Sequence, residues 1–167
     1  MDMRICLVGH FIDNPDEGVR NVAKTISNLF DRFDVEHKCV NVSNINAIKD
    51  IYRYNPDIIH YILSPSVPGY LMSYLISCLL PKSKTVISAI HSNIPKLRIL
   101  SIFNPDMVYV QSHASEDVFS YLGANTFFLP NGVDTDKFHP CELSDRIRLR
   151  KKYGVPIDKF VILHLAS

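Results

Sequence analysis

Short apolar runs alternate with longer stretches of helical spacing along almost the whole chain. The apolar runs predict β-strands over residues 4–8, 35–42, 58–63, 84–90, 107–111 and 126–129. The stretches between them predict helices over residues 19–33, around 48–52, over 67–80 and 96–103, and up to 122. Because the strands are apolar throughout and each is followed by a helix, they predict an α/β fold. Its sheet is doubly wound and mostly parallel, with helices on both faces.

Polar residues and glycines mark the ends of these helices. Ser43 or Asn44 can cap the second helix, and Ser112 or Ser115 can cap the fifth. Gly123 is expected to end the fifth helix, since glycine readily adopts the left-handed backbone of a C-terminal cap.

One edge of the predicted sheet carries the candidate functional residues. Right-handed crossovers put every strand-to-helix loop on the carboxyl edge, where ligands bind near a switch in strand order. The first of these loops carries Asn14, Glu17 and Gly18 just before and at the start of the first helix. The free N–H groups of a helix start can hold a phosphate, and Gly18 would let a ligand approach the backbone. The same loop also reads as an ordinary helix start, with Asp16 as the cap and Glu17 complementing the helix dipole.

His91 stands at the end of the fourth predicted strand, on the same edge. A neutral imidazole there can exchange hydrogen bonds with a sugar hydroxyl or a phosphate oxygen, but it can equally be a satisfied structural residue. His60 lies inside the third strand and is predicted to be core. The seven histidines show neither H-x-x-x-H nor H-E-x-x-H spacing, so no metal site is expected.

Several common chemistries lack their sequence motifs in this chain. The six glycines form no G-x-G-x-x-G fingerprint, and the phosphate-loop lysine motif is absent. Spacing identifies no Ser-His-Asp arrangement and no pair of carboxylates. We therefore expect no bound cofactor.

Charge and composition narrow the expected partners and setting. The net charge of +1 gives no basic field for nucleic acid. The four scattered cysteines are predicted to be free thiols in a reducing, cytoplasmic setting, with Cys6 and Cys39 buried in strands. No charged residue lies between Asp57 and Lys82, but prolines break this apolar stretch below the roughly 20 residues of a membrane span. It is read as buried core, with peripheral membrane contact as the alternative.

The last part of the chain follows a different pattern. Residues 144–153 predict a charged helix, and residues 160–165 predict a new apolar strand. A parallel strand needs a neighbour, so we expect these residues to begin a second domain of a longer protein. The expected domains are therefore residues 1–140 and residues 141–167.

Two segments near the end of the chain resemble a known family. Residues 129–140, LPNGVDTDKFHP, resemble the P-N-G-V-D-x-x-x-F-x-P signature of family 4 glycosyltransferases, which have the GT-B fold of two Rossmann-like domains. Residues 150–163 resemble the R-x-x-x-G-I-P-x-D-x-F-V-I-L entry into the second domain of that family. Three weaker matches agree in order and spacing. They are residues 17–19 with the G-G-V-E acceptor loop, residues 85–91 with a strand ending in H-D or H-G, and residues 106–112 with A-D-x-V-I-x-x-S.

The resemblance implies a function for each candidate residue. The family transfers a sugar, with retention, from a nucleotide-diphosphate sugar to an acceptor. The first loop, with Asn14, Glu17 and Gly18, would then bind the acceptor, a sugar or a lipid-linked molecule, and His91 would contact the donor sugar as the catalytic histidine. Asn131 and Gly132 would lie at the interdomain cleft. Glu17 departs from the glycine of the family loop, which lowers the positive potential expected for a phosphate there.

The diphosphate contacts of the family belong to an Arg/Lys pair and an E-x7-E motif in its second, donor domain. Neither occurs in these 167 residues, so we expect this chain alone to be inactive. The alternatives are a non-catalytic module that binds a sugar or phosphate and half of a nucleotide-sugar epimerase. Downstream sequence carrying the Arg/Lys pair and E-x7-E would favour transfer.

Overall fold

The computed structural model describes residues 3–11, 18–63, 65–91, 94, 97–136 and 138–162. The chain divides into two compact units, residues 1–130 and residues 131–167. The first unit contains the sheet and nearly all of the regular structure. The division lies before the boundary expected at residue 140, and the assignment of residues 141–167 to a further domain stays a prediction.

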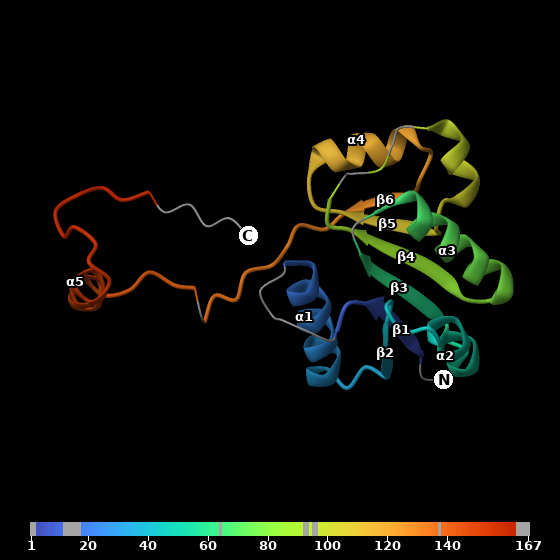
Figure 1. Cartoon of the computed structure of the whole chain (residues 1–167), viewed down its shortest axis with the longest axis horizontal. Coiled ribbons are helices and arrows are strands. Elements are labelled where there is room, and N and C mark those ends of the chain that lie inside the picture. The colour runs from blue at the N-terminus through green and yellow to red at the C-terminus, as the bar shows by residue number, and fades with distance from the viewer. Residues whose placement is uncertain are drawn as a thin grey trace. The chain divides into compact units, whose positions relative to one another are not determined.

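The first unit is built on six parallel strands in the order β2-β1-β3-β4-β5-β6 (Figure 1). The strands are β1 (Ile5–Gly9), β2 (His37–Asn41), β3 (Ile58–Leu63), β4 (Lys84–Ala89), β5 (Met107–Val110) and β6 (Thr126–Phe128). All five pairings are parallel. The predicted α/β fold with a parallel sheet is therefore confirmed.

The sheet is most deeply buried along its middle strands. Ile59 of β3 lies between Cys6 of β1 and Thr85 of β4, and all three side chains are buried. The edge strands are more exposed, and this corrects one expectation. Cys39 on edge strand β2 is exposed rather than buried, and its sulfur lies 3.2 Å from the Ser27 hydroxyl oxygen. Burial raises the pKa of Cys6 to about 12, so this thiol stays protonated.

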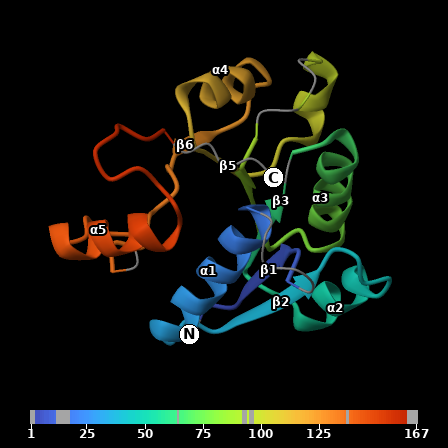
Figure 2. The same cartoon turned by 60° about the vertical axis from the view of Figure 1, so that its left-hand side comes forward.

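Helices cover the two faces of the sheet unequally. Helix α1 (Gly18–Arg32) packs on one face, where Ala23 joins Leu7 and Ile62 in a small apolar cluster. The other face carries α2 (Ala47–Tyr54), α3 (Val67–Leu79), the 3-10 helix η1 (Arg98–Phe103) and α4 (His113–Tyr121), which together form the main core (Figures 1 and 2). The predicted fourth helix, residues 96–103, is found as the short η1. Leu97 precedes it as the N-terminal cap, and Lys96 lies outside the described residues.

The helix ends confirm some of the predicted capping residues and correct others. Ser112 caps α4 by accepting a hydrogen bond from the Ser115 N–H, and Gly123 follows the helix with φ +73°. For α2, neither Ser43 nor Asn44 is the N-terminal cap, because the helix begins after Asn46. The Asn44 side chain instead accepts from the Asn46 N–H at 2.9 Å, closing a turn before the helix.

The second unit contains one regular element among its described residues, helix α5 (Leu143–Lys152), in which no residue is buried. The strand predicted over residues 160–165 is not found in its described part, residues 160–162. Phe160 and Ile162 are 91% and 83% exposed. A parallel strand takes its hydrogen bonds from a neighbouring strand, and the described part of this unit offers none. Residues 163–165 lie outside the described residues.

Candidate functional site

The strand order identifies the point at which a ligand crevice is expected. From β1 the chain moves outward to β2, then returns past β1 to β3 and continues in the opposite direction. The winding therefore reverses between β1 and β3, and the helices that follow these two strands, α1 and α3, lie on opposite faces of the sheet (Figure 2). In open parallel sheets this switch point is the usual ligand site. The first loop, chosen from the sequence, is one of the two that flank it.

Gly9 holds helix α1 close to the sheet at this point. An added Cβ on Gly9 would lie 3.3 Å from the Ile62 carbonyl oxygen of β3 and 3.4 Å from the Ala23 Cβ of α1. The contact with the backbone carbonyl is tighter than an ordinary Cβ contact, so the position leaves little room for a side chain. Sequence reasoning did not select this residue, although a glycine at the end of a strand was the available signal.

The acceptor residues proposed from the sequence are only partly described. Asn14 and Glu17 lie outside the described residues. Gly18 is the first residue of α1 and is exposed, and an added Cβ there would meet nothing within 4 Å. Packing in the described part of the chain therefore does not require a glycine at position 18, and this first residue of the helix is exposed to solvent.

His91 lies just beyond β4, one strand away from the switch point. Its side chain is exposed, and the described residues provide it with no hydrogen-bond partner. His60 differs from His91 in both burial and hydrogen bonding. It is buried, its Nε2 lies 2.8 Å from the Ser88 hydroxyl oxygen, and burial lowers its pKa to about 4. The expected core position of His60 is confirmed, and His91 has a ring available to a ligand.

Two buried tyrosines below the end of β3 escaped the sequence analysis. The hydroxyls of Tyr61 and Tyr70 are buried without a hydrogen-bond partner among the described residues. Both residues line a cavity of about 10 Å³ together with Pro65, Ser66 and Gly69. That volume is close to the least that can hold a single water molecule. The cavity is therefore too small to hold a sugar, and the switch point between β1 and β3 remains the candidate site.

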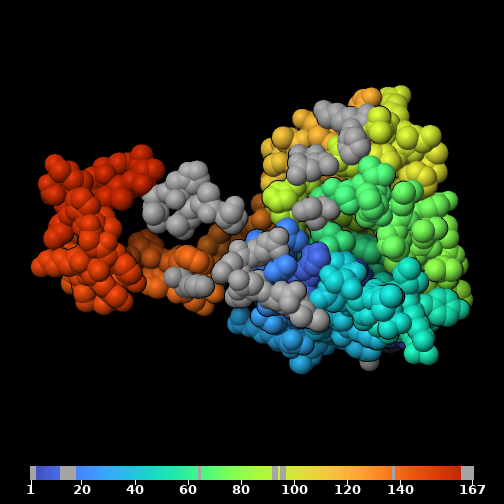
Figure 3. All heavy atoms as spheres, viewed as in Figure 1, coloured from blue at the N-terminus to red at the C-terminus, as the bar shows by residue number. Residues whose placement is uncertain are grey.

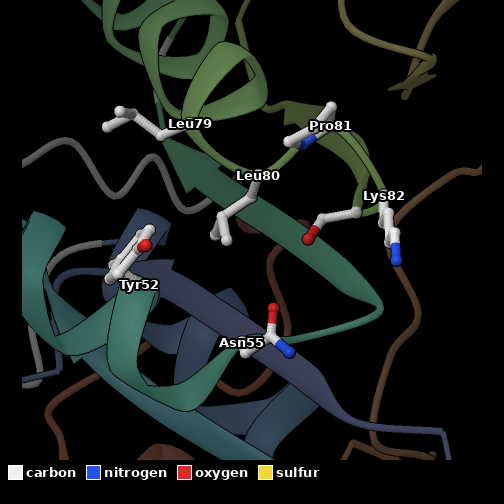
Figure 4. Close-up of a pocket in the computed structure, with 7 residues that line it drawn as sticks. Tyr52, Asn55, Leu79, Leu80, Pro81 and Lys82 are labelled. Atoms are coloured by element: carbon white, nitrogen blue, oxygen red, sulfur yellow. The ribbon is translucent and has the colours of Figure 1, made fainter.

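A second pocket lies at the other edge of the sheet. It has a volume of about 420 Å³ and is lined by Tyr52, Asn55, Leu79, Leu80, Pro81, Lys82 and Ser83 (Figure 4). Tyr52 and Asn55 come from the end of α2, opposite the end of α3. These residues precede β3 and β4, so the pocket opens at the amino edge. It contains none of the residues selected from the sequence.

Asn131 and Gly132 begin the second compact unit. Gly132 is exposed, its φ is not positive, and an added Cβ would meet nothing within 4 Å. The PNG segment therefore does not need its glycine for a left-handed turn or for packing among the described residues.

Metal and membrane signatures are absent from the part of the chain that the structure describes. Its histidines, cysteines and carboxylates form no group of three or more that could hold a metal ion. Its helices include none that is long and apolar enough to cross a bilayer.

Comparison with known proteins adds no identification to this site. No protein-family model matches the sequence, and a search of curated proteins finds no match either.

Proposed function

We propose that residues 1–130 form the acceptor-side domain of a retaining glycosyltransferase that uses a nucleotide-diphosphate sugar. The observation that carries the proposal is the LPNGVDTDKFHP segment, which resembles the signature of family 4 glycosyltransferases. It starts directly after β6, the last strand of the doubly wound sheet. A Rossmann-like domain followed by this signature is the arrangement that the resemblance leads us to expect.

The proposed mechanism divides the chemistry between two domains. In the transition state, positive charge develops on the sugar ring and negative charge on the departing diphosphate. His91, with its exposed ring at the carboxyl edge, contacts a hydroxyl or oxygen of the donor sugar. The start of α1 at Gly18 contributes free backbone N–H groups to the acceptor side. The diphosphate is held by the Arg/Lys pair and the E-x7-E motif of a donor domain.

This division of labour predicts that the 167 residues alone are inactive. Sugar transfer needs both walls of the cleft, and domain closure brings the donor and acceptor together. Turnover by the isolated chain at the rate of a protein that also carries the donor domain would contradict the proposal.

The test is mass-spectrometric product analysis of the full-length protein with a panel of nucleotide sugars and candidate acceptors. The proposal predicts an acceptor product heavier by one sugar residue, with the anomeric configuration of the donor retained. Binding of sugars without any transfer would instead favour a non-catalytic module. Conversion of the nucleotide sugar to its epimer would favour an epimerase.

A further inference from the structure

Helix α3 is apolar on every side, yet only part of it is covered by the protein. Its buried residues are Tyr70, Ser73 and Ile76, which face the core. Its outward side is formed by Leu71, Met72, Leu75 and Leu79, which are 39%, 42%, 55% and 53% exposed. A helix that is hydrophobic all round is normally buried, either in a core or in a membrane. At 13 residues, α3 is too short to span a bilayer, which needs about 20.

The 3-10 helix η1 extends this apolar exposure beside α3. The two elements pack together, and the rings of Tyr74 and Phe103 meet edge to face at 5.1 Å. Ile99 and Ile102 of η1 are 66% and 61% exposed. Figures 1 and 2 show η1 next to α3, and the two adjoin in the space-filling view (Figure 3). We call the exposed residues Leu71, Met72, Leu75, Leu79, Ile99 and Ile102 the α3–η1 surface. Exposed apolar clusters of this kind commonly mark interaction sites.

The two serine hydroxyls of α3 are already satisfied within the helix. Ser77 is exposed, but its hydroxyl donates to the Tyr74 carbonyl oxygen at 2.7 Å. Ser73 donates in the same way to the Tyr70 carbonyl oxygen at 2.8 Å. A serine that bonds back to its own helix needs no water, so these hydroxyls tolerate an apolar environment.

The segment that carries the α3–η1 surface has only positively charged residues among its lysines, arginines and carboxylates. Residues 58–105 contain Lys82, Lys84, Lys96 and Arg98 but no aspartate or glutamate, although the whole chain carries 17 acidic residues. Lys82 follows the end of α3, and Arg98 opens η1, with its guanidinium 5.5 Å from the centre of the Tyr121 ring. Lys84 is paired with Asp106. Among the described residues of this segment, Lys82 and Arg98 are therefore the cations that form no ion pair.

We propose that the α3–η1 surface docks on an anionic lipid bilayer as a peripheral contact. Apolar side chains enter the boundary between headgroups and acyl chains, while Lys82 and Arg98 meet the anionic headgroups. A second copy of the chain is a poorer occupant. A two-fold contact through this surface would bring like charges together, with no carboxylate in residues 58–105 to offset them. This inference is independent of the glycosyltransferase proposal.

The test is flotation of the 167-residue chain with lipid vesicles. The chain should float with phosphatidylcholine vesicles that contain about 30% phosphatidylserine, and bind pure phosphatidylcholine at least about tenfold more weakly. Added salt should weaken the binding to the anionic vesicles, because the cations act through a screened potential.

Two sets of variants separate the apolar and the charged contributions. The double variant Leu75→Glu with Ile99→Glu should lose at least about tenfold in vesicle affinity, since carboxylates would have to enter the interface. Lys82→Gln and Arg98→Gln should each lose about fivefold, the equivalent of one cation near an anionic surface. The matched control is Leu29→Glu on α1, which lies on the opposite face of the sheet. Leu29 is 42% exposed, and its substitution should leave vesicle binding unchanged.

Thermal melts followed by circular dichroism show whether each variant folds. If the double variant does not fold, the two cation variants still test the proposal. The proposal is overturned if the chain fails to float with anionic vesicles, or if Leu29→Glu reduces binding as much as the double variant. A dimer in sedimentation equilibrium that Leu75→Glu abolishes, without vesicle binding by the original chain, would assign the surface to self-association.

Discussion

At the scale of single residues, Gly9 leaves little room for a side chain beside the switch point. Replacing it by alanine should lower the free energy of unfolding by about 1–3 kcal/mol, because the new methyl group meets the Ile62 carbonyl oxygen and Ala23. The matched control is Gly18→Ala at the open start of α1. There the same methyl group has free space and should raise stability by about 0.4–1 kcal/mol. Urea denaturation of both variants measures the difference. Equal effects would show that Gly9 is not a close contact.

His60 should make stability depend on pH in the mildly acidic range. Burial lowers its pKa from 6.5 to about 4, so the unfolded chain binds a proton more readily than the folded one. Its stabilising contribution is complete above pH 6.5 and is lost as the pH falls toward 4. We expect the free energy of unfolding to decrease over this window. In His60→Gln, which has no titrating ring, the decrease should be smaller. An unchanged slope in the variant would contradict the assignment.

At the scale of elements, two aspartate carboxylates link neighbouring strands at the amino edge of the sheet through hydrogen bonds. The Asp57 carboxylate accepts a hydrogen bond from the Arg4 N–H at 2.8 Å, next to β1 and β3. The Asp106 carboxylate accepts from the N–H of Thr85 at 2.8 Å and from its hydroxyl at 3.1 Å, which links β4 to the start of β5. Burial opposes ionisation of Asp106, but hydrogen bonds from Lys84 and Thr85 hold its pKa below its usual value. The two edges of the sheet therefore differ, with structural carboxylates at one and the candidate site at the other.

Removing the Asp106 carboxylate should weaken the joint between β4 and β5. Asp106→Ala leaves the buried Thr85 N–H and hydroxyl without this partner, so we expect a loss of about 1–3 kcal/mol. Lys84→Met removes only an exposed ammonium group and should change stability little. Thermal or urea unfolding of the two variants provides the comparison. A larger effect of the lysine substitution would mean that the ion pair, rather than the carboxylate's bonds to Thr85, stabilises the joint.

The bounds of an element could be predicted from the sequence most accurately where prolines flank it on both sides. The strand at 58–63 was predicted with its observed bounds, since Pro56 and Pro65 flank an apolar run. The strand at 160–165 was wrong in its described part because apolar composition cannot supply a neighbouring strand. The order of the strands in the sheet could not be predicted from the pattern of apolar and polar residues either. The carboxyl edge could be predicted from alternation alone, but the position of the switch between β1 and β3 depends on pairing between distant segments.

The same limit applies to the candidate site. His91 and Gly18 could be selected because their place relative to a strand end or helix start is readable in the sequence. Gly9, Tyr61 and Tyr70 could not, because close approach and burial arise only from tertiary packing. The roles assigned to Asn14, Glu17, Asn131 and Gly132 stay predictions.

For the molecule as a whole, the proposal joins a complete doubly wound unit to a signature segment. The first unit has its own core on both faces of its sheet, whereas the described part of the second has one helix with no buried residue. A domain that binds one substrate and depends on another domain for the leaving group accounts for this combination. It also accounts for an exposed histidine at the carboxyl edge that the described fold does not use.

The most direct test is the turnover of nucleotide sugar by the full-length protein with His91→Ala. The account predicts that turnover falls about a hundredfold or more, as when one preorganised donor is removed from an active site. The unfolding temperature should stay the same, because the His91 side chain is exposed and bonds to no described residue. Unchanged turnover, or a loss of turnover that only follows a loss of stability, would contradict the account.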